Sequence, residues 1–550
     1  MANPEWTVMI YFAGDNNLAE EMIWAVKDIQ SWWLSHEEER KKVKVVAMFD
    51  AGGPPLLVDF DKTKGKYEPE EIELALDRDL VKNADSEREK DDLKRAGSTE
   101  KDTNIQISSV QKTLTRFISK TLRNQSEYFM LVLSGHGSGA IGDFLTGDKR
   151  ISGLTIPALG EVASEVYEMR DRKKIDILGL DSCQMGMAEV AFQVQDSVQF
   201  MIGAEGFTPN TGWPYEKILS SLFAKNSPVA RKPEDFAEQI VQKYVEYYLP
   251  YTTAEVSTDI SAINLTNLGA LRDGITNFTA ALEIEKIGEI ENLPIKKRDA
   301  RLEELRQETL LKKEQKTKKE SKDPRQKDQK RTKRQPFLDA IILARREAQG
   351  YKREQYVDLW DFCSCLKERL DALEEDEGNN KGKRLNQACK DIMNAIDLID
   401  GPRGEGIVRL SGYCGPRFQY SHGLSIYFPW ASFTDAAGIA DLGHYQLLKF
   451  AKDTHWDEFL RVYLHATKRA VRERYVDKQG GLHSSLLNRL TGLLTVGPGK
   501  DANVSTADRD ANVSTADRSK LAIGKIESMK NPPTGWYESD MTLPPRRPKK

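Results

Sequence analysis

Two segments decide the fold: Tyr128-Phe-Met-Leu-Val-Leu-Ser-Gly-His136-Gly137 and Ile175-Asp-Ile-Leu-Gly-Leu-Asp-Ser-Cys183. Each is a continuous apolar run that ends in glycine or polar residues, which is typical of a strand buried on both faces of a parallel sheet. Side chains that perform chemistry in such sheets collect just beyond the carboxyl ends of the strands. Two neighbouring strands of this kind would bring His136 and Cys183 side by side. We therefore predict one functional site at this edge of the sheet.

Strands and helices alternate along much of the chain. Further apolar runs indicate strands at Thr7–Phe12, Val43–Phe49, Val198–Ala204 and Gly423–Pro429, the last of which we expect to return to the sheet. Helical periodicity appears between them, at 18–34, 105–122, 154–169 and 445–470. This alternation predicts an α/β fold with a mostly parallel central sheet and a largely helical C-terminal region.

Composition divides the chain into four parts. Residues 1–290 carry the strand and helix pattern of a catalytic domain. Between Glu291 and Gln335 there are 17 Lys or Arg and 9 Asp or Glu, so we expect 291–336 to be a charged, flexible insert that cannot fold by itself. Helices and a late strand in 337–470 are expected to complete the fold. The rest, 471–550, is predicted to be a mostly disordered tail that contains a duplicated nonapeptide.

Charge and hydropathy exclude several classes of partner. With 81 basic and 85 acidic residues the chain is near neutral, so no global field favours nucleic acid or an anionic membrane. No apolar run is long enough to span a bilayer, and no secretory signal precedes the first strand. Five cysteines are too few for a disulfide framework and lack zinc-ligand spacing. We expect a cytoplasmic monomer.

A cysteine and a histidine at neighbouring strand ends are suited to nucleophilic catalysis. A thiol needs a base or a lowered pKa to attack an amide, and a helix beginning after Cys183 would favour the thiolate. His136 could accept the thiol proton and return it to the leaving amine. The backbone N–H groups of Gly137 and Cys183 would form a two-donor oxyanion hole.

Two other interpretations of these segments stay open. Cys183 could be an inert core cysteine and His136 an ordinary turn residue. The glycines of Gly137-Ser-Gly-Ala-Ile-Gly142 also match a dinucleotide-binding fingerprint, which would make the protein an oxidoreductase. That fingerprint requires a helix to open on its glycines. The next residues, 143–150, are rich in Gly and turn formers, so we regard the match as accidental.

The chain resembles clostripain-like cysteine peptidases, within the wider caspase-like clan. The resemblance lies in His136-Gly137, in Asp181-Ser-Cys-Gln-Met-Gly-Met187, in Gly212-Trp-Pro-Tyr215, and in the first and last strands. It implies a caspase-like αβα sandwich and endopeptidase activity on peptide or protein substrates. Cys183 would be the nucleophile, His136 its partner and Gly137 a donor to the oxyanion.

Specificity, processing and cofactors follow from the same resemblance. Acidic groups in the substrate pocket imply cleavage after Arg or Lys, and one such group matches Asp181. The other usually precedes the Gly-Trp pair, where this sequence has Thr211, and its loss should weaken the grip on a cation; Glu205 could substitute. Family members cut themselves between the His and Cys strands, which suggests Lys149-Arg150. The chemistry itself requires no cofactor, although the family implies calcium.

A second functional hypothesis comes from another class. The chain could be a catalytically inactive caspase-like scaffold that binds peptide or protein partners. Joint retention of His136, Gly137, Asp181 and Cys183 favours the peptidase, because an inactive site need not keep all four.

Overall fold

The structure is a computed structural model that describes twelve stretches of the chain. They are residues 4–50, 55–60, 109–122, 126–142, 144–147, 153–223, 230–282, 336–351, 355–371, 380–397, 405–429 and 444–464. The tail at 471–550, the Lys149-Arg150 pair and all but the last residue of the insert at 291–336 lie outside the described residues.

The chain forms two compact units. The first contains Met1–Thr266 and Val408–Ser425, and the second contains Asn267–Ile407 and Ile426–Thr467. All residues of the predicted site that the structure describes belong to the first unit.

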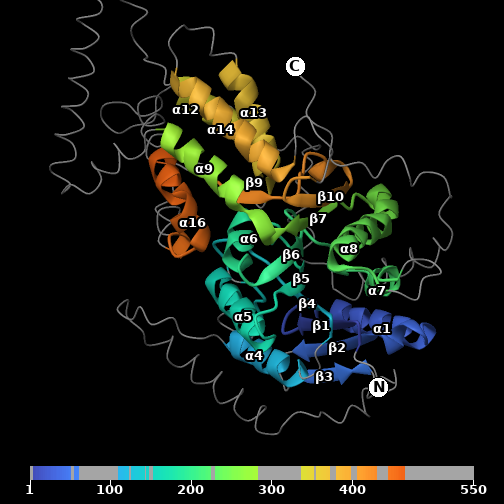
Figure 1. The fold of residues 1–550 in the computed structure, drawn as a ribbon. Coiled ribbons are helices and arrows are strands. Elements are labelled where there is room, and N and C mark those ends of the chain that lie inside the picture. The colour runs from blue at the N-terminus through green and yellow to red at the C-terminus, as the bar shows by residue number, and fades with distance from the viewer. Residues whose placement is uncertain are drawn as a thin grey trace, which may run out of the picture. The chain divides into compact units, whose positions relative to one another are not determined.

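An eight-stranded sheet organises the first unit, in the order β10-β7-β6-β5-β4-β1-β2-β3 (Figure 1). The strands are β1 (Trp6–Ala13), β2 (Val43–Asp50), β3 (Leu56–Asp59), β4 (Tyr128–Ser134), β5 (Ile175–Asp181), β6 (Val198–Gly203), β7 (Thr258–Asn264) and β10 (Val408–Cys414). The five central strands, from β6 to β2, run parallel, and the outer strands β3, β7 and β10 are antiparallel to their neighbours. The predicted, mostly parallel sheet is confirmed.

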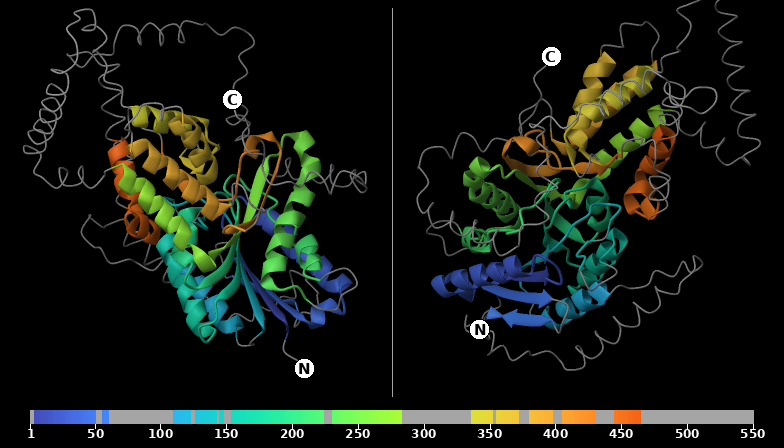
Figure 2. Two further views of the ribbon diagram at one scale, coloured as in Figure 1. Left: turned by 45° about the horizontal axis from the view of Figure 1, so that its top comes forward. Right: turned by 180° about the vertical axis from the view of Figure 1, so that it is seen from behind.

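Helices cover both faces of this sheet (Figure 2). On one face lie α1 (Ala19–Ser35), α7 (Tyr215–Ser221) and α8 (Pro233–Tyr248), which bury a core with alternate residues of the strands. On the other lie α4 (Ser109–Thr121), α5 (Ile156–Met169) and α6 (Ala188–Val194). Because both faces are covered, β1 is buried along its whole length, as its unbroken apolar sequence predicts. The expected αβα sandwich is therefore confirmed.

The late strand of the sheet differs from our prediction. We expected Gly423–Pro429 to return to the main sheet. Instead the eight-stranded sheet receives β10, which pairs with β7. β11 (Ser425–Tyr427) belongs to a three-stranded sheet of order β11-β9-β8, with β9 at Tyr356–Asp358 and β8 at Gly350–Tyr351. The sequence did not indicate a strand at 408–414, because this segment has no continuous apolar run. Its buried residues are separated by pairs of partly exposed ones.

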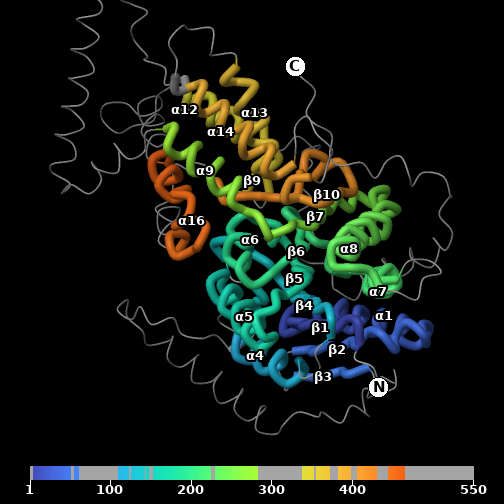
Figure 3. Tube along the Cα trace, viewed as in Figure 1, coloured from blue at the N-terminus to red at the C-terminus, as the bar shows by residue number. Residues whose placement is uncertain are grey.

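The path of the chain reverses direction at β1. After β1 the chain forms β2 on one side, and it later returns to form β4 on the other side of β1 (Figure 3). From β4 it continues outward through β5 and β6. A reversal of this kind opens a crevice beyond the carboxyl ends of the two strands, here β1 and β4.

The second unit is mainly helical. Its helices are α9 (Gly269–Ala281), α12 (Pro336–Glu347), α13 (Leu359–Asp371), α14 (Asn380–Ile396) and α16 (Lys449–Thr454), with the short strands β8 (Gly350–Tyr351) and β9 (Tyr356–Asp358). Aromatic rings of Phe278, Phe428, Trp456 and Phe459 pack edge to face or tilted at its centre. The predicted helical C-terminal region is present.

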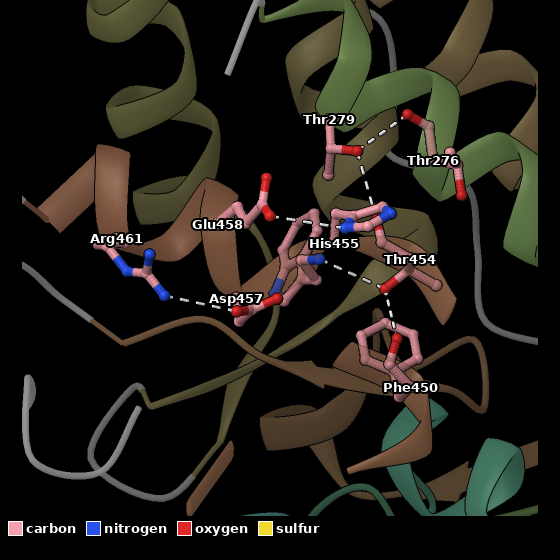
Figure 4. Close-up of polar contacts among 9 residues, drawn as sticks. Thr276, Thr279, Phe450, Thr454, His455, Asp457, Glu458 and Arg461 are labelled. Carbon is pink, nitrogen blue, oxygen red and sulfur yellow. Dashed lines mark hydrogen bonds and ion pairs between the residues drawn. The ribbon is translucent and has the colours of Figure 1, made fainter. Parts of the chain in front are cut away.

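Polar contacts connect the end of α16 to α9 within this unit (Figure 4). The Thr279 hydroxyl of α9 donates to the Thr454 carbonyl at 3.3 Å. His455 follows with a left-handed backbone, φ 58°, which stops the helix, and its ring lies 3.6 Å from the Glu458 carboxylate. This histidine ends a helix and lies in the second unit, so it is not part of the candidate site.

Candidate active site

Three loops meet beyond the carboxyl ends of β1, β4 and β5. Asn17 follows β1, His136 follows β4 and Cys183 follows β5. These three strands are consecutive neighbours in the sheet, and Ser134 at the end of β4 pairs with Asp181 at the end of β5. The prediction that the His136 and Cys183 strands are neighbours is therefore confirmed.

His136 and Cys183 line one hollow, of about 430 Å³ with its open mouth included. Its walls also come from α1 and from the loop after β6. The remaining lining residues are Leu18, Glu21, Met22, Ala25, Ser134, Gly135, Asp181, Ser182, Thr208, Pro209, Asn210, Thr211 and Gly212. Charged and apolar side chains thus share one cavity with the candidate nucleophile.

Asn17 holds the imidazole of His136. Its Oδ1 lies 2.6 Å from Nε2 of the ring, so Nε2–H donates and Nδ1 is the nitrogen that can accept a proton. The turn is fixed by Asn16, whose side-chain amide donates to the carbonyls of Ala13 and Thr146 at 2.8 and 3.0 Å. We did not predict Asn17 as a site residue. The available signal was a cluster of polar residues directly after a buried strand.

The thiol of Cys183 is not activated in the way the sequence suggested. We expected the helical stretch after this turn to favour the thiolate, and that helix is present as α6, which begins at Ala188. The dipole of a helix acts mainly within its first turn, and the first turn of α6 does not include Cys183. Burial raises the pKa of the Cys183 thiol, and the nearby Asp181 and Asp259 carboxylates raise it further. The thiol therefore needs a base to become a nucleophile.

Gly137 lies directly against the backbone of Cys183. A Cβ atom at Gly137 would stand 2.0 Å from the Cys183 carbonyl oxygen and 3.2 Å from its nitrogen. No side chain fits into that space, so only glycine permits the loops after β4 and β5 to approach this closely. The two backbones predicted to form the oxyanion hole are therefore neighbours.

Asp181 is buried in the wall of the hollow, with 4% of its surface exposed. Its Oδ2 accepts hydrogen bonds from the Tyr215 hydroxyl at 2.9 Å and from the Ser134 hydroxyl at 3.0 Å. Burial raises the pKa of Asp181 to about 6, against the opposing effect of the Tyr215 hydrogen bond. Gly212 covers the carboxylate with a left-handed backbone, φ 64°, and a Cβ there would stand 2.8 Å from Oδ2.

Thr211 contributes a neutral hydroxyl to the same hollow. Its Oγ1 lies 2.8 Å from the Tyr248 hydroxyl, which itself donates to the Gly212 carbonyl at 2.5 Å. Since the single phenolic proton of Tyr248 is used there, Thr211 is the donor in their hydrogen bond. This position supplies no charge to the pocket.

Glu205 does not replace the carboxylate missing at Thr211. Its side chain is fully buried, its Oε2 accepts the Gly423 N–H at 2.7 Å, and it does not line the hollow. The loop that begins here is anchored by Asp259, whose carboxylate accepts the N–H groups of Glu205 and Gly206 at 2.8 and 2.9 Å. Further along the loop, the Thr208 carbonyl lies 3.7 Å from the sulfur of Cys183.

Two other observations concern binding partners. Within the stretches that the structure describes, no three His, Cys, Asp or Glu side chains gather to hold a metal ion. None of the described helices is long and apolar enough to cross a membrane.

Comparison with known proteins identifies a family. Residues 10–463 match the model of the clostripain family, Peptidase_C11. A secreted C11 cysteine protease from Bacteroides thetaiotaomicron, solved with an irreversible peptide inhibitor, shows 15% identity, a TM-score of 0.45 and coverage of 82% of this chain and 99% of that one. An inactive zymogen C11 protease from Parabacteroides distasonis shows 16% identity and a TM-score of 0.44, with coverage of 82% of this chain and 99% of that one. A comparison with curated proteins gives no match. Nothing in these comparisons supports the predicted cytoplasmic location.

Proposed function

Because the chain belongs to the clostripain family and is a cysteine peptidase, we propose that it cleaves peptide bonds with a dyad of Cys183 and His136. Its substrates are peptides or proteins, and the reaction is hydrolysis. The observation that carries the proposal is the shared hollow that is lined both by His136, oriented by Asn17, and by Cys183.

The first half-reaction forms an acyl-enzyme. Nδ1 of His136 takes the proton from Sγ of Cys183, and the sulfur attacks the carbonyl carbon of the scissile bond. The N–H groups of Gly137 and Cys183 stabilise the negative charge that develops on the carbonyl oxygen. When the intermediate collapses, His136 gives its proton to the leaving amine, and the acyl group stays on the sulfur as a thioester.

The second half-reaction restores the enzyme. His136 takes a proton from a water molecule, whose oxygen attacks the thioester carbonyl in the same oxyanion hole. The carboxylic acid product leaves, and the proton held by His136 returns to the thiolate. Since burial raises the pKa of the Cys183 thiol, we expect general-base assistance in both halves rather than a preformed ion pair.

Specificity, processing and assembly form the finer part of the proposal. Asp181 in the wall of the hollow supports cleavage after Arg or Lys, because a buried carboxylate favours a cationic side chain. Self-cleavage between His136 and Cys183, at Lys149-Arg150, would then fit the same preference. We further propose that the enzyme acts as a monomer, and that any effect of calcium lies outside the chemical steps.

A comparison of three proteins tests the dyad. Wild type, Cys183→Ala and Cys414→Ala would be run on gels and against a peptide library, with calcium and with a chelator. Cys414 is a matched control, because it is a buried cysteine of the first unit whose thiol donates to the Val245 carbonyl. Wild type and Cys414→Ala should cleave peptides and show cutting near Lys149-Arg150, while Cys183→Ala should do neither.

The inactive-scaffold alternative predicts a different outcome. All three proteins would remain intact and none would turn over any peptide in the library. In that case iodoacetamide would also fail to distinguish Cys183 from an ordinary thiol, and the search would turn to peptides that bind without being cut.

A further inference from the structure

The substrate hollow contains a carboxylate that the sequence motifs do not reveal. Glu21 on α1 lines the same hollow as Asp181, Cys183 and His136. The expected position of a second carboxylate is occupied by Thr211, whose hydroxyl is tied to Tyr248. The hollow is therefore lined by two carboxylates, Asp181 at the end of β5 and Glu21 on α1.

We propose that Glu21 supplies the second carboxylate of the specificity pocket, so that Glu21 and Asp181 together bind the cationic side chain that precedes the cleaved bond. The inference deepens the proposed function and rests on it.

The carboxylates of Glu21 and Asp181 are both suited to bind a cation. Oε2 of Glu21 and Oδ1 of Asp181 are buried oxygen atoms without a hydrogen-bond partner among the described residues. Burial raises the pKa of Glu21, and the neighbouring Glu20 carboxylate raises it further. Two desolvated acids in one cavity disfavour their own ionisation, and a bound cation removes that cost.

The apolar lining matches the stem of a long basic side chain. Leu18, which directly precedes α1, and Met22 and Ala25 of α1 line the hollow together with Glu21. The four positions follow the i, i+3, i+4, i+7 spacing of one helix face. Methylene groups of Lys or Arg can pack on such a face while the charged end reaches the acids.

The helix that carries Glu21 is fixed at two points. At its start, the Leu18 N–H donates to Oδ1 of Asn16 at 2.9 Å. Two turns into the helix, the Asp28 carboxylate accepts the Glu216 N–H at the beginning of α7, at 2.8 Å. Because both contacts hold α1 in place within the first unit, the backbone of Glu21 has a fixed position beside the pocket.

A set of matched substrates isolates the charge effect. Peptides with Lys or norleucine, and with Arg or citrulline, before the cleaved bond would be assayed on wild type, Glu21→Gln and Glu20→Gln. In Glu21→Gln, kcat/KM should fall about tenfold for Lys and Arg, as expected for loss of one charge-assisted contact, while norleucine and citrulline change little. Glu20 is exposed and does not line the hollow, so Glu20→Gln should keep the wild-type ratios.

A rescue variant and a binding assay complete the test. Adding Thr211→Asp to Glu21→Gln should restore much of the preference for Lys and Arg. Agmatine binding to Cys183→Ala, measured by calorimetry, should weaken about tenfold when Glu21→Gln is added. If Glu21→Gln keeps both the wild-type Lys-to-norleucine ratio and the agmatine affinity, the assignment of Glu21 is wrong. If the wild type cleaves no peptide but agmatine still depends on Glu21, the peptidase proposal fails while the cation site stands.

Discussion

Oδ1 of Asn17 lies 2.6 Å from Nε2 of His136, across 119 positions of sequence. The contact joins the loops after β1 and β4 and selects the tautomer in which Nδ1 is basic. Asn17 is thus a positioning residue. We expect Asn17→Ala to lower kcat by about 10- to 100-fold through misorientation of the ring, with the thermal midpoint of unfolding nearly unchanged.

The variant Asn17→Asp distinguishes a positioning role from a merely structural one, because only a positioning role predicts a shift in the pH profile of kcat/KM. A carboxylate next to the ring favours the imidazolium, which cannot act as a base, so the acidic limb of the pH profile of kcat/KM should shift to higher pH. An unshifted profile for Asn17→Asp, together with full activity of Asn17→Ala, would contradict the positioning role.

Gly137→Ala should inactivate the enzyme. The added Cβ would stand 2.0 Å from the Cys183 carbonyl, so the loops after β4 and β5 must separate and the oxyanion donors with them. We expect kcat to fall by about 100-fold or more, the size seen when one oxyanion donor is lost. Gly269→Ala is a suitable control, since only the Asn267 side chain lies near its Cβ position, at 3.5 Å. Equal activity of both variants would exclude the proposed oxyanion hole.

Asp181→Asn should separate stability from specificity. The pKa of Asp181 is raised to about 6 from an ordinary 3.8, so its protonated form contributes stability that is complete below pH 3.8 and lost as the pH rises through 6. Replacement by Asn should therefore increase the free energy of unfolding above pH 6, by at most about 3 kcal/mol, and have little effect at pH 4. Urea midpoints across this range, compared with kcat/KM for Lys and norleucine peptides, measure both consequences. A variant that is less stable than wild type at pH 7.5 would contradict a net cost of ionising this buried carboxyl.

Asp259→Ala should loosen the substrate loop. The carboxylate accepts two consecutive N–H groups, those of Glu205 and Gly206, and the loop continues to Thr208 and Thr211 at the pocket. Leaving two buried donors unsatisfied should cost about 2–5 kcal/mol of the free energy of unfolding. We expect KM to rise more than kcat falls, because the loop forms the pocket wall rather than the dyad. Asp273→Ala, which removes an exposed carboxylate of α9, serves as the control.

The sequence predicts the dyad of His136 and Cys183 but not the residue that orients His136. Continuous apolar runs mark β4 and β5 as buried parallel strands, and their polar endings place His136 and Cys183 at one edge. Asn17 could not be assigned in the same way, because its role depends on β1 lying next to β4, and strand order is set by long-range packing. The helix expected after Cys183 is present as α6, but the apolar run at 187–192 does not show that burial raises the pKa of the thiol.

Glu21 illustrates a second limit. On a helix with apolar neighbours, a glutamate is ordinarily a solvated residue, and only the fold shows that its face of α1 borders the cavity. Thr211, by contrast, could be read from sequence as the loss of a carboxylate. The carboxylate that we propose as its replacement, Glu21, lies on α1. A sequence motif limited to the loop after β6 does not include that helix.

The reversal of the chain at β1 also determines when the enzyme can first act during synthesis. β1 is made early, yet its partner on one side, β4, begins at residue 128 and the nucleophile follows β5 at residue 183. Contacts between such distant segments form slowly, because long loops must close before the pairing stabilises them. A nascent chain that lacks β5 has no complete site, so the topology itself delays proteolysis until the central sheet is assembled.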